Sequence, residues 1–215
     1  MGKTTTKPEG ATSYKETAFG IISRSKLLHL ELEGTKRGLE YLYGLVKEQK
    51  NVTITPQLIC KLHGVSFGWI FPQWAGEYRT IQVTFSGKES LPYYQIPELV
   101  ANCCKDLEER IKQLPGPDRE EFIVEVGKLL AWFQHRVVVI HPFQDYNGRI
   151  ARMLTVLILL TRNLPPIEIK AESPTDRKRY ITAMQDADAG NFSTLEGLIG
   201  HALGETLEQF RREHA

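Results

Sequence analysis

Residues 141–152 carry side chains that could do chemistry together, and they read His-Pro-Phe-Gln-Asp-Tyr-Asn-Gly-Arg-Ile-Ala-Arg. His141 supplies an imidazole that can accept a proton near neutral pH. Asp145 supplies a hard carboxylate oxygen of the kind that binds Mg²⁺. Pro142 stops a preceding helix and pushes His141 out of helical geometry. The stretch therefore predicts a base and a metal ligand on one short loop.

The same stretch offers groups that bind anions. Arg149 and Arg152 are three residues apart and share one face of a helix, where two guanidinium groups can clamp phosphate oxygens. Asn147-Gly148 tolerates left-handed backbone and can open that helix, so that its N–H groups converge on an anion. Together these groups predict transfer from a nucleoside triphosphate. The alternative is a proline-broken loop with a solvated arginine pair.

This stretch resembles the motif of the Fic (filamentation induced by cAMP) family, His-Pro-Phe-x-Asp/Glu-Gly-Asn-Gly-Arg-x-x-Arg, and matches eight of its nine fixed positions. A second segment, Trp-Ala-Gly-Glu-Tyr-Arg at residues 74–79, resembles a hexapeptide found upstream in Fic domains. The resemblance implies a mainly α fold, with a single Fic-type helical domain and a small β-hairpin flap. It leaves the role of Arg79 open.

The resemblance also implies a function. A Fic protein of this kind is a protein adenylyltransferase, which moves AMP from its co-substrate ATP to a Ser, Thr or Tyr hydroxyl of a target protein. The resemblance assigns the roles to these residues: His141 as the base, Asp145 as the Mg²⁺ ligand, Asn147 and Gly148 as the anion nest, Arg149 for the departing phosphates and Arg152 for the terminal phosphate.

Tyr146 departs from the motif, which has glycine at this position. Glycine adopts positive φ freely and lets the backbone approach a phosphate, whereas a bulky residue at φ > 0 costs about 1–2 kcal/mol. If the ring obstructs the nest, Tyr146→Gly should increase ATP affinity. Two alternatives to the adenylyltransferase therefore stay open: a catalytically impaired Fic-fold binding module, or a Fic enzyme that transfers another phosphate-containing group.

Glu33 is a candidate inhibitor of the site. Many Fic proteins carry an inhibitory helix with a Ser/Thr-x-x-x-Glu-Gly/Asn signature, and Glu33-Gly34 fits its second half, although His29 stands in place of Ser or Thr. A carboxylate that reached Arg152 would occupy the arginine needed for the terminal phosphate. The alternative is a solvated carboxylate on a helix.

Alternating residues after position 80 predict the flap, with Ile81, Val83 and Phe85 on one side and a turn at 86–88. An exposed strand edge there could pair with the backbone of a target. We expect a flexible tail at residues 1–14 and the Fic domain at 15–215. Within that domain we expect the inhibitory helix at 20–35, the flap at 79–93 and the active-site loop at 141–152.

Composition excludes several classes. The chain has 215 residues, of which 41% are hydrophobic and 25% charged, and its net charge of +1 gives no sign of nucleic-acid binding. Its longest apolar run is too short to span a bilayer, so we expect no membrane association. Three cysteines without metal spacing predict reduced thiols in a cytoplasm. We also expect a bacterial protein. Oligomeric state is not predicted.

Overall fold

The computed structural model describes residues 14–49, 51–85, 87–169 and 173–213, and this part of the chain forms a helical bundle with two small β-hairpins. The helices are α1 (Arg24–Glu48), α2 (Pro56–Phe67), α3 (Ile96–Lys112), α4 (Phe122–Ile140), α5 (Asn147–Thr161), α6 (Pro174–Asp188) and α7 (Ser193–Glu213). The strands are β1 (Tyr14–Thr17), β2 (Gly20–Ser23), β3 (Thr84–Phe85) and β4 (Lys88–Glu89), and a short 3₁₀ turn spans Tyr93–Gln95. The prediction of a mainly α domain with a small hairpin is confirmed.

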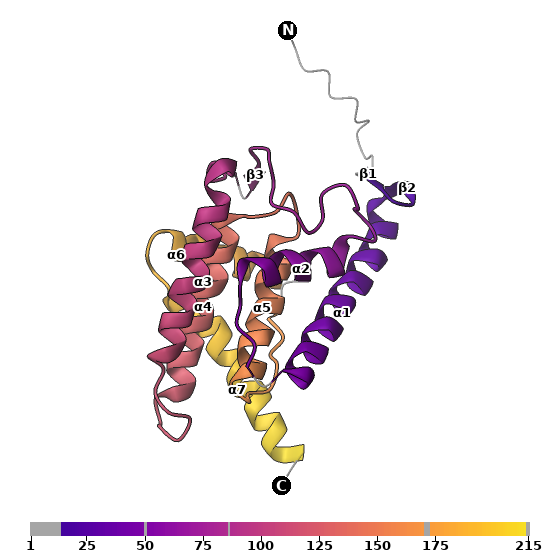
Figure 1. Ribbon diagram of the computed structural model, residues 1–215. Coiled ribbons are helices and arrows are strands. Elements are labelled where there is room, and N and C mark those ends of the chain that lie inside the picture. Colours follow the sequence, from indigo (N-terminus) through magenta and orange to yellow (C-terminus); the bar gives the residue numbers. More distant parts are fainter. Residues whose placement is uncertain (1–13, 50, 86, 170–172, 214–215) are drawn as a thin grey trace.

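Helices α4 and α5 form the centre of the bundle, and the loop of residues 141–146 joins them. Figure 1 shows α5 between α1 on one side and α3 with α4 on the other. Most of α5 is buried, since its apolar residues extend around the helix. Inside this core the Gln134 amide of α4 donates to the Thr155 hydroxyl of α5 at 3.0 Å. The two helices that hold the active-site loop are therefore rigidly paired.

Helix α1 is one continuous helix of 25 residues, whereas the sequence predicts an inhibitory helix at residues 20–35. A Cβ at Gly34 would lie 2.4 Å from the Ser66 carbonyl oxygen, and one at Gly38 would lie 2.2 Å from the Ser66 hydroxyl. These glycines serve close packing of α1 on α2 and do not break the helix. The expected inhibitory helix at 20–35 is thus partly strand β2 and partly the first half of α1.

Two helices begin at a hydroxyl cap. The Thr55 hydroxyl accepts a hydrogen bond from the Leu58 N–H at 3.1 Å and caps α2, and the Ser173 hydroxyl does the same for the Asp176 N–H and caps α6. Residues 118–121 form turns and bends, and α4 begins at Phe122.

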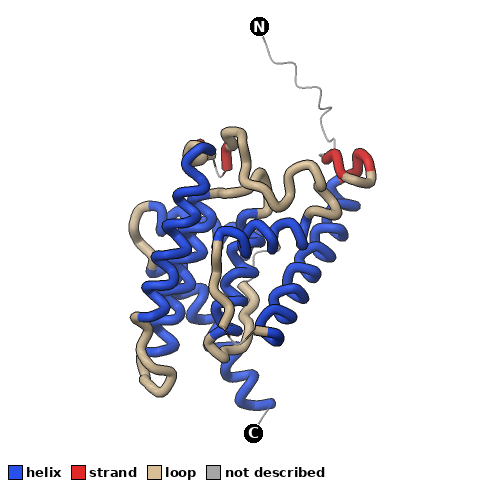
Figure 2. Tube along the Cα trace, viewed as in Figure 1, coloured by secondary structure: helices blue, strands red, loops and turns tan. Residues whose placement is uncertain are grey.

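Both hairpins lie at the same end of the bundle (Figure 2). The flap is shorter than its alternating pattern suggests, with Thr84 paired to Glu89 and Phe85 to Lys88. The N-terminal hairpin, β1 with β2, is not predicted from the sequence, and its strand β1 begins at Tyr14. The expected tail falls almost entirely outside the described residues. None of the helices within the described ranges is long and apolar enough to cross a membrane.

Candidate active site

Asn147 pins the active-site loop into its shape. Its side-chain oxygen accepts from the Phe143 N–H and its side-chain nitrogen donates to the Phe143 carbonyl, both at 2.9 Å. Asn147 is 2% exposed, and both polar atoms of its side chain are used in hydrogen bonds within the loop. Asn147 is therefore placed to meet an anion through its backbone N–H at the start of α5, and not through its side chain.

His141 ends α4 in the left-handed region, with φ of 52°. Its Nδ1 lies 3.2 Å from the Val138 carbonyl oxygen, which can only accept, so Nδ1 carries the proton and Nε2 is left as an acceptor. Phe85 of the flap stacks on the imidazole at 4.0 Å between ring centroids. Burial, helped by the charge of Arg79, lowers the pKa of His141 to about 4. At neutral pH the ring is uncharged and can take a proton.

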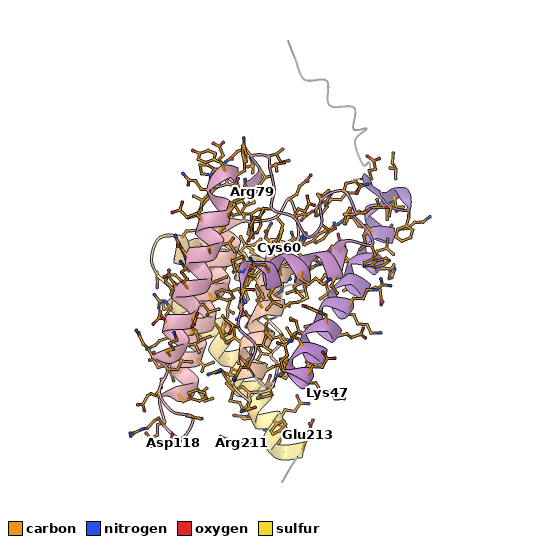
Figure 3. The ribbon with its side chains drawn as sticks, in the orientation of Figure 1. Lys47, Cys60, Arg79, Asp118, Arg211 and Glu213 are labelled. Carbon is orange, nitrogen blue, oxygen red and sulfur yellow. The ribbon has the colours of Figure 1, made fainter. Side chains whose placement is uncertain are left out.

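Arg79 ties the flap to the active-site loop. Its Nε donates to the His141 carbonyl at 2.7 Å, its Nη1 to the Ile81 carbonyl at 2.9 Å and its Nη2 to the Leu91 carbonyl at 2.6 Å. Arg79 is only 4% exposed and lies at the end of the bundle that carries the hairpins (Figure 3). This residue, whose role the sequence left open, holds both ends of the flap against His141.

Asp145 also lies in the loop, and its two carboxylate oxygens have different partners. Oδ1 accepts the Tyr146 N–H at 2.7 Å, and Oδ2 pairs with the ammonium group of Lys15 from β1. Burial alone would raise the pKa of Asp145. The charge and hydrogen bond of Lys15, the Tyr146 N–H and the charge of Arg24 together outweigh burial and lower that pKa. Among the described residues no three His, Cys, Asp or Glu side chains could hold a metal together. A single carboxylate still fits Mg²⁺ that arrives on phosphates, since Mg²⁺ commonly takes one or two protein carboxylates.

Tyr146 precedes α5 with φ of 63°, the conformation for which the motif has glycine. Its ring does not cover the nest. It packs inward, stacked on Phe67 at 4.1 Å and on Trp74 at 6.1 Å between ring centroids, and the residue is 7% exposed. The backbone N–H groups of the first turn of α5 therefore stay clear of the ring.

Arg149 and Arg152 reach a common cavity of about 390 Å³ between α1, α5 and the segment 166–169. Arg152 stacks over the Tyr180 ring at 5.7 Å, and Arg149 pairs with a carboxylate of α1 at 2.9 Å. Gly148 comes directly before Arg149 on the first turn of α5, where a Cβ would meet the Arg152 side chain at 3.6 Å. The structure thus brings the nest and both arginines to the start of one helix.

The carboxylate that meets Arg149 is Glu31, whereas the predicted inhibitor was Glu33, reaching Arg152. Glu31 is fully buried, whereas Glu33 is 44% exposed and pairs with Arg37 of the same helix at 3.1 Å. The structure does not bring Glu33 to the active-site loop. A signal for Glu31 exists in the sequence, because it falls on the buried stripe of α1 with Leu27, Gly34, Gly38 and Leu42.

His63 supports the loop from α2, a role that the sequence does not reveal. The Gly76 N–H donates to its Nδ1 at 2.8 Å, so Nε2 carries the proton and donates to the Asp145 carbonyl at 3.2 Å. The ring stacks on Phe143 at 3.9 Å and is fully buried. Burial lowers the pKa of His63 to about 4, so this histidine stays neutral and acts as a brace.

Comparison with known proteins points to one family. The model described as "Fic/DOC family" matches residues 53–159. The relative "Protein adenylyltransferase Fic" of Nematostella vectensis is 28% identical over 195 residues, which cover 91% of this chain and 43% of the relative. This chain therefore spans less than half the length of that curated relative.

Solved structures share the fold. A fragment of Fic-1 from C. elegans superposes with a TM-score of 0.66 at 24% identity and covers 86% of this chain and 52% of its own. BepC, a VirB-translocated effector of Bartonella tribocorum with bound AMPPNP, superposes with a TM-score of 0.61 at 18% identity and covers 90% of this chain and 93% of its own. At these identities the likeness concerns the arrangement of helices.

Proposed function

We propose that this chain, which belongs to the Fic/DOC family through residues 53–159, is a protein adenylyltransferase that moves AMP from ATP to a Ser, Thr or Tyr hydroxyl of a target protein. One observation carries the proposal: His141 keeps its Nε2 as a proton acceptor beside an anion-binding helix start. The relative from Nematostella vectensis is named for the same activity.

The reaction is a substitution at the α-phosphorus. Nε2 of His141 takes the proton of the target hydroxyl, and the hydroxyl oxygen forms a bond to the α-phosphorus. The bond from that phosphorus to the bridging oxygen breaks, and pyrophosphate leaves. The N–H groups of Asn147 and Gly148 face the phosphate charge, and Arg149 and Arg152 neutralise the leaving group. Asp145 would hold Mg²⁺, which supplies charge neutralisation when bound with ATP.

The flap offers a place for the target. Strands β3 and β4 pair with each other, and within the described residues neither is joined to a further strand. An extended segment of the target can therefore add to a strand edge beside His141. The cytoplasm suits the three free thiols, of which Cys103 and Cys104 are buried and have a pKa raised to about 12, chiefly by burial. Bacterial origin and the inhibitory role of Glu33 stay predictions.

Labelled ATP tests the proposal. Label on the α-phosphate should move to protein, and His141→Ala should abolish that transfer while ATP still binds. Transfer of γ-label would instead favour the enzyme that moves another phosphate-containing group. Absence of ATP binding in calorimetry would favour the binding module. The inward packing of the Tyr146 ring speaks against this last alternative, because the nest is left clear.

A further inference from the structure

The Glu31 carboxylate lies at the centre of a buried network that joins α1 to the active-site loop. Its Oε1 accepts from the Tyr146 hydroxyl at 2.9 Å and from Arg24 at 2.8 Å, and its Oε2 accepts from Nη2 of Arg149 at 2.9 Å. Glu31 has no exposed surface. A buried carboxylate is tolerated only when it is paired and hydrogen-bonded, and here both oxygens are satisfied.

The network retains a positive charge, because two guanidinium groups face one carboxylate. Arg24 is 47% exposed at its side chain and is solvated, whereas Arg149 is 15% exposed. Nη1 of Arg149 is buried and has no hydrogen-bond partner in the described part of the chain. An unpaired buried donor on a charged group is costly. Arg149 also lines the adjoining cavity, so an anionic ligand there would lie beside its guanidinium charge.

Tyr146 gives the network its geometry. Its φ of 63° is unfavourable for an aromatic residue, but the stack on Phe67 and the hydrogen bond to Glu31 fix the side chain in this conformation. The hydroxyl directs the Glu31 carboxylate, and the carboxylate fixes one nitrogen of the Arg149 fork. A glycine at this position would relieve the backbone and leave Glu31 without one of its donors.

We infer that Tyr146 and Glu31 are positioning residues for Arg149: they hold its guanidinium, through Nη2, beside the cavity that takes the phosphates of the nucleotide. The identity of that ligand rests on the proposed function. In this arrangement Tyr146 stands in place of the motif glycine and supports the site, and replacing this tyrosine weakens phosphate binding. Glu31 acts through Arg149 and does not itself touch the nucleotide.

Calorimetry of Tyr146→Phe tests the inference, because this change removes the hydroxyl and keeps the ring. We expect ATP to bind about tenfold more weakly, as for the loss of one hydrogen bond to a charged group. Adenosine, which lacks phosphates, should bind wild type and variant equally. In an Arg149→Met background Tyr146→Phe should have no further effect, since the residue it positions is gone. A general loss of structure would weaken adenosine binding too.

Tyr78→Phe is the control, because Tyr78 is a partly buried tyrosine whose ring packs on the loop, against Phe143, and no contact with Arg149 is found for it in the described part of the chain. Unchanged or tighter ATP binding by Tyr146→Phe would overturn the inference, and tighter binding would mean that Glu31 competes with phosphate. Inorganic triphosphate separates the two proposals. If it binds with the same dependence on Tyr146 and ATP does not bind, the positioning role stands and the adenylyltransferase proposal falls. If neither binds wild type, both fall.

Discussion

The two hairpins each place one side chain on the active-site loop, but they do so by different physical means. The N-terminal hairpin sets the ammonium group of Lys15 on Asp145, and the flap sets the ring of Phe85 on His141. Both turn through a glycine at positive φ, Gly20 at 83° and Gly87 at 76°. One contact is an ion pair and the other is the stacking of two uncharged rings.

The anchors of the hairpins differ as well. The flap is held at its base by Arg79, which donates to the carbonyls on both sides of it and to that of His141. The N-terminal hairpin rests on the 69–70 segment through the Ala18 N–H, which donates to the Ile70 carbonyl at 2.8 Å, and through Phe19, which packs edge-on against Trp69. The buried guanidinium of Arg79 therefore fixes the flap. The other hairpin is joined to the active-site loop by the partly exposed ion pair of Lys15 with Asp145, in which a metal ion could take the place of Lys15.

Arg79→Met should have the largest effect, because it removes three hydrogen bonds from a buried guanidinium and leaves their carbonyls unpaired. We expect the free energy of unfolding to fall by about 3 kcal/mol, measured in urea, and AMP transfer to fall roughly 100-fold. Arg212→Met, at an exposed pair with Glu208, is the control. An unchanged unfolding curve would show that the flap is not held by Arg79.

Phe85→Ala should change the pH dependence of transfer. The pKa of His141 is lowered to about 4, so in wild type the neutral, active ring predominates above that pH and the rate falls only as pH drops through about 4. Without Phe85 water reaches the imidazole and its pKa moves up toward 6.5. The fall should then begin at higher pH, with about tenfold less transfer at pH 5 if the pKa reaches about 6. A pH profile identical to wild type would mean that the flap does not desolvate His141.

Lys15→Met should have a smaller and opposite effect, since it frees the Oδ2 oxygen of Asp145. Mg²⁺ should bind about fivefold more tightly in calorimetry with a non-hydrolysable ATP analogue, because a competing cation has been removed. Lys88→Met, in the flap and paired with Asp188, is the matched control and should leave metal affinity unchanged. Weaker metal or nucleotide binding by Lys15→Met would show that Lys15 helps to hold phosphates.

The two hairpins also differ in how far the sequence reveals them. The flap is predicted from the alternation of Ile81, Val83 and Phe85, whereas residues 14–23 lack a clear alternating pattern. Helices α2 and α6 begin at caps that are visible in the sequence, Thr55-Pro56 and Ser173-Pro174. Glycine lowers helix propensity, but at Gly34 the close contact with Ser66 outweighs this cost and α1 continues through it.

The active site divides in the same way. Residues 141–152 were identified because the groups that carry the chemistry are adjacent in the chain. The side chains that hold them come from far away: Glu31 lies 115 residues before Tyr146, and His63 lies 82 residues before Asp145. Such partners leave no local pattern, since only the folded packing of α1 and α2 brings them to the loop. The contact of Arg79 with the loop is hidden for the same reason.

The buried place of Glu31 has a consequence for how this protein can be divided. The segment that matches the family model starts at residue 53, after the end of α1. A recombinant fragment trimmed to that segment would expose the surface of Ser66 that Gly34 covers, and it would leave the Tyr146 hydroxyl and Arg149 without their shared acceptor. The smallest unit that can be excised with its chemistry intact therefore extends upstream at least to Arg24.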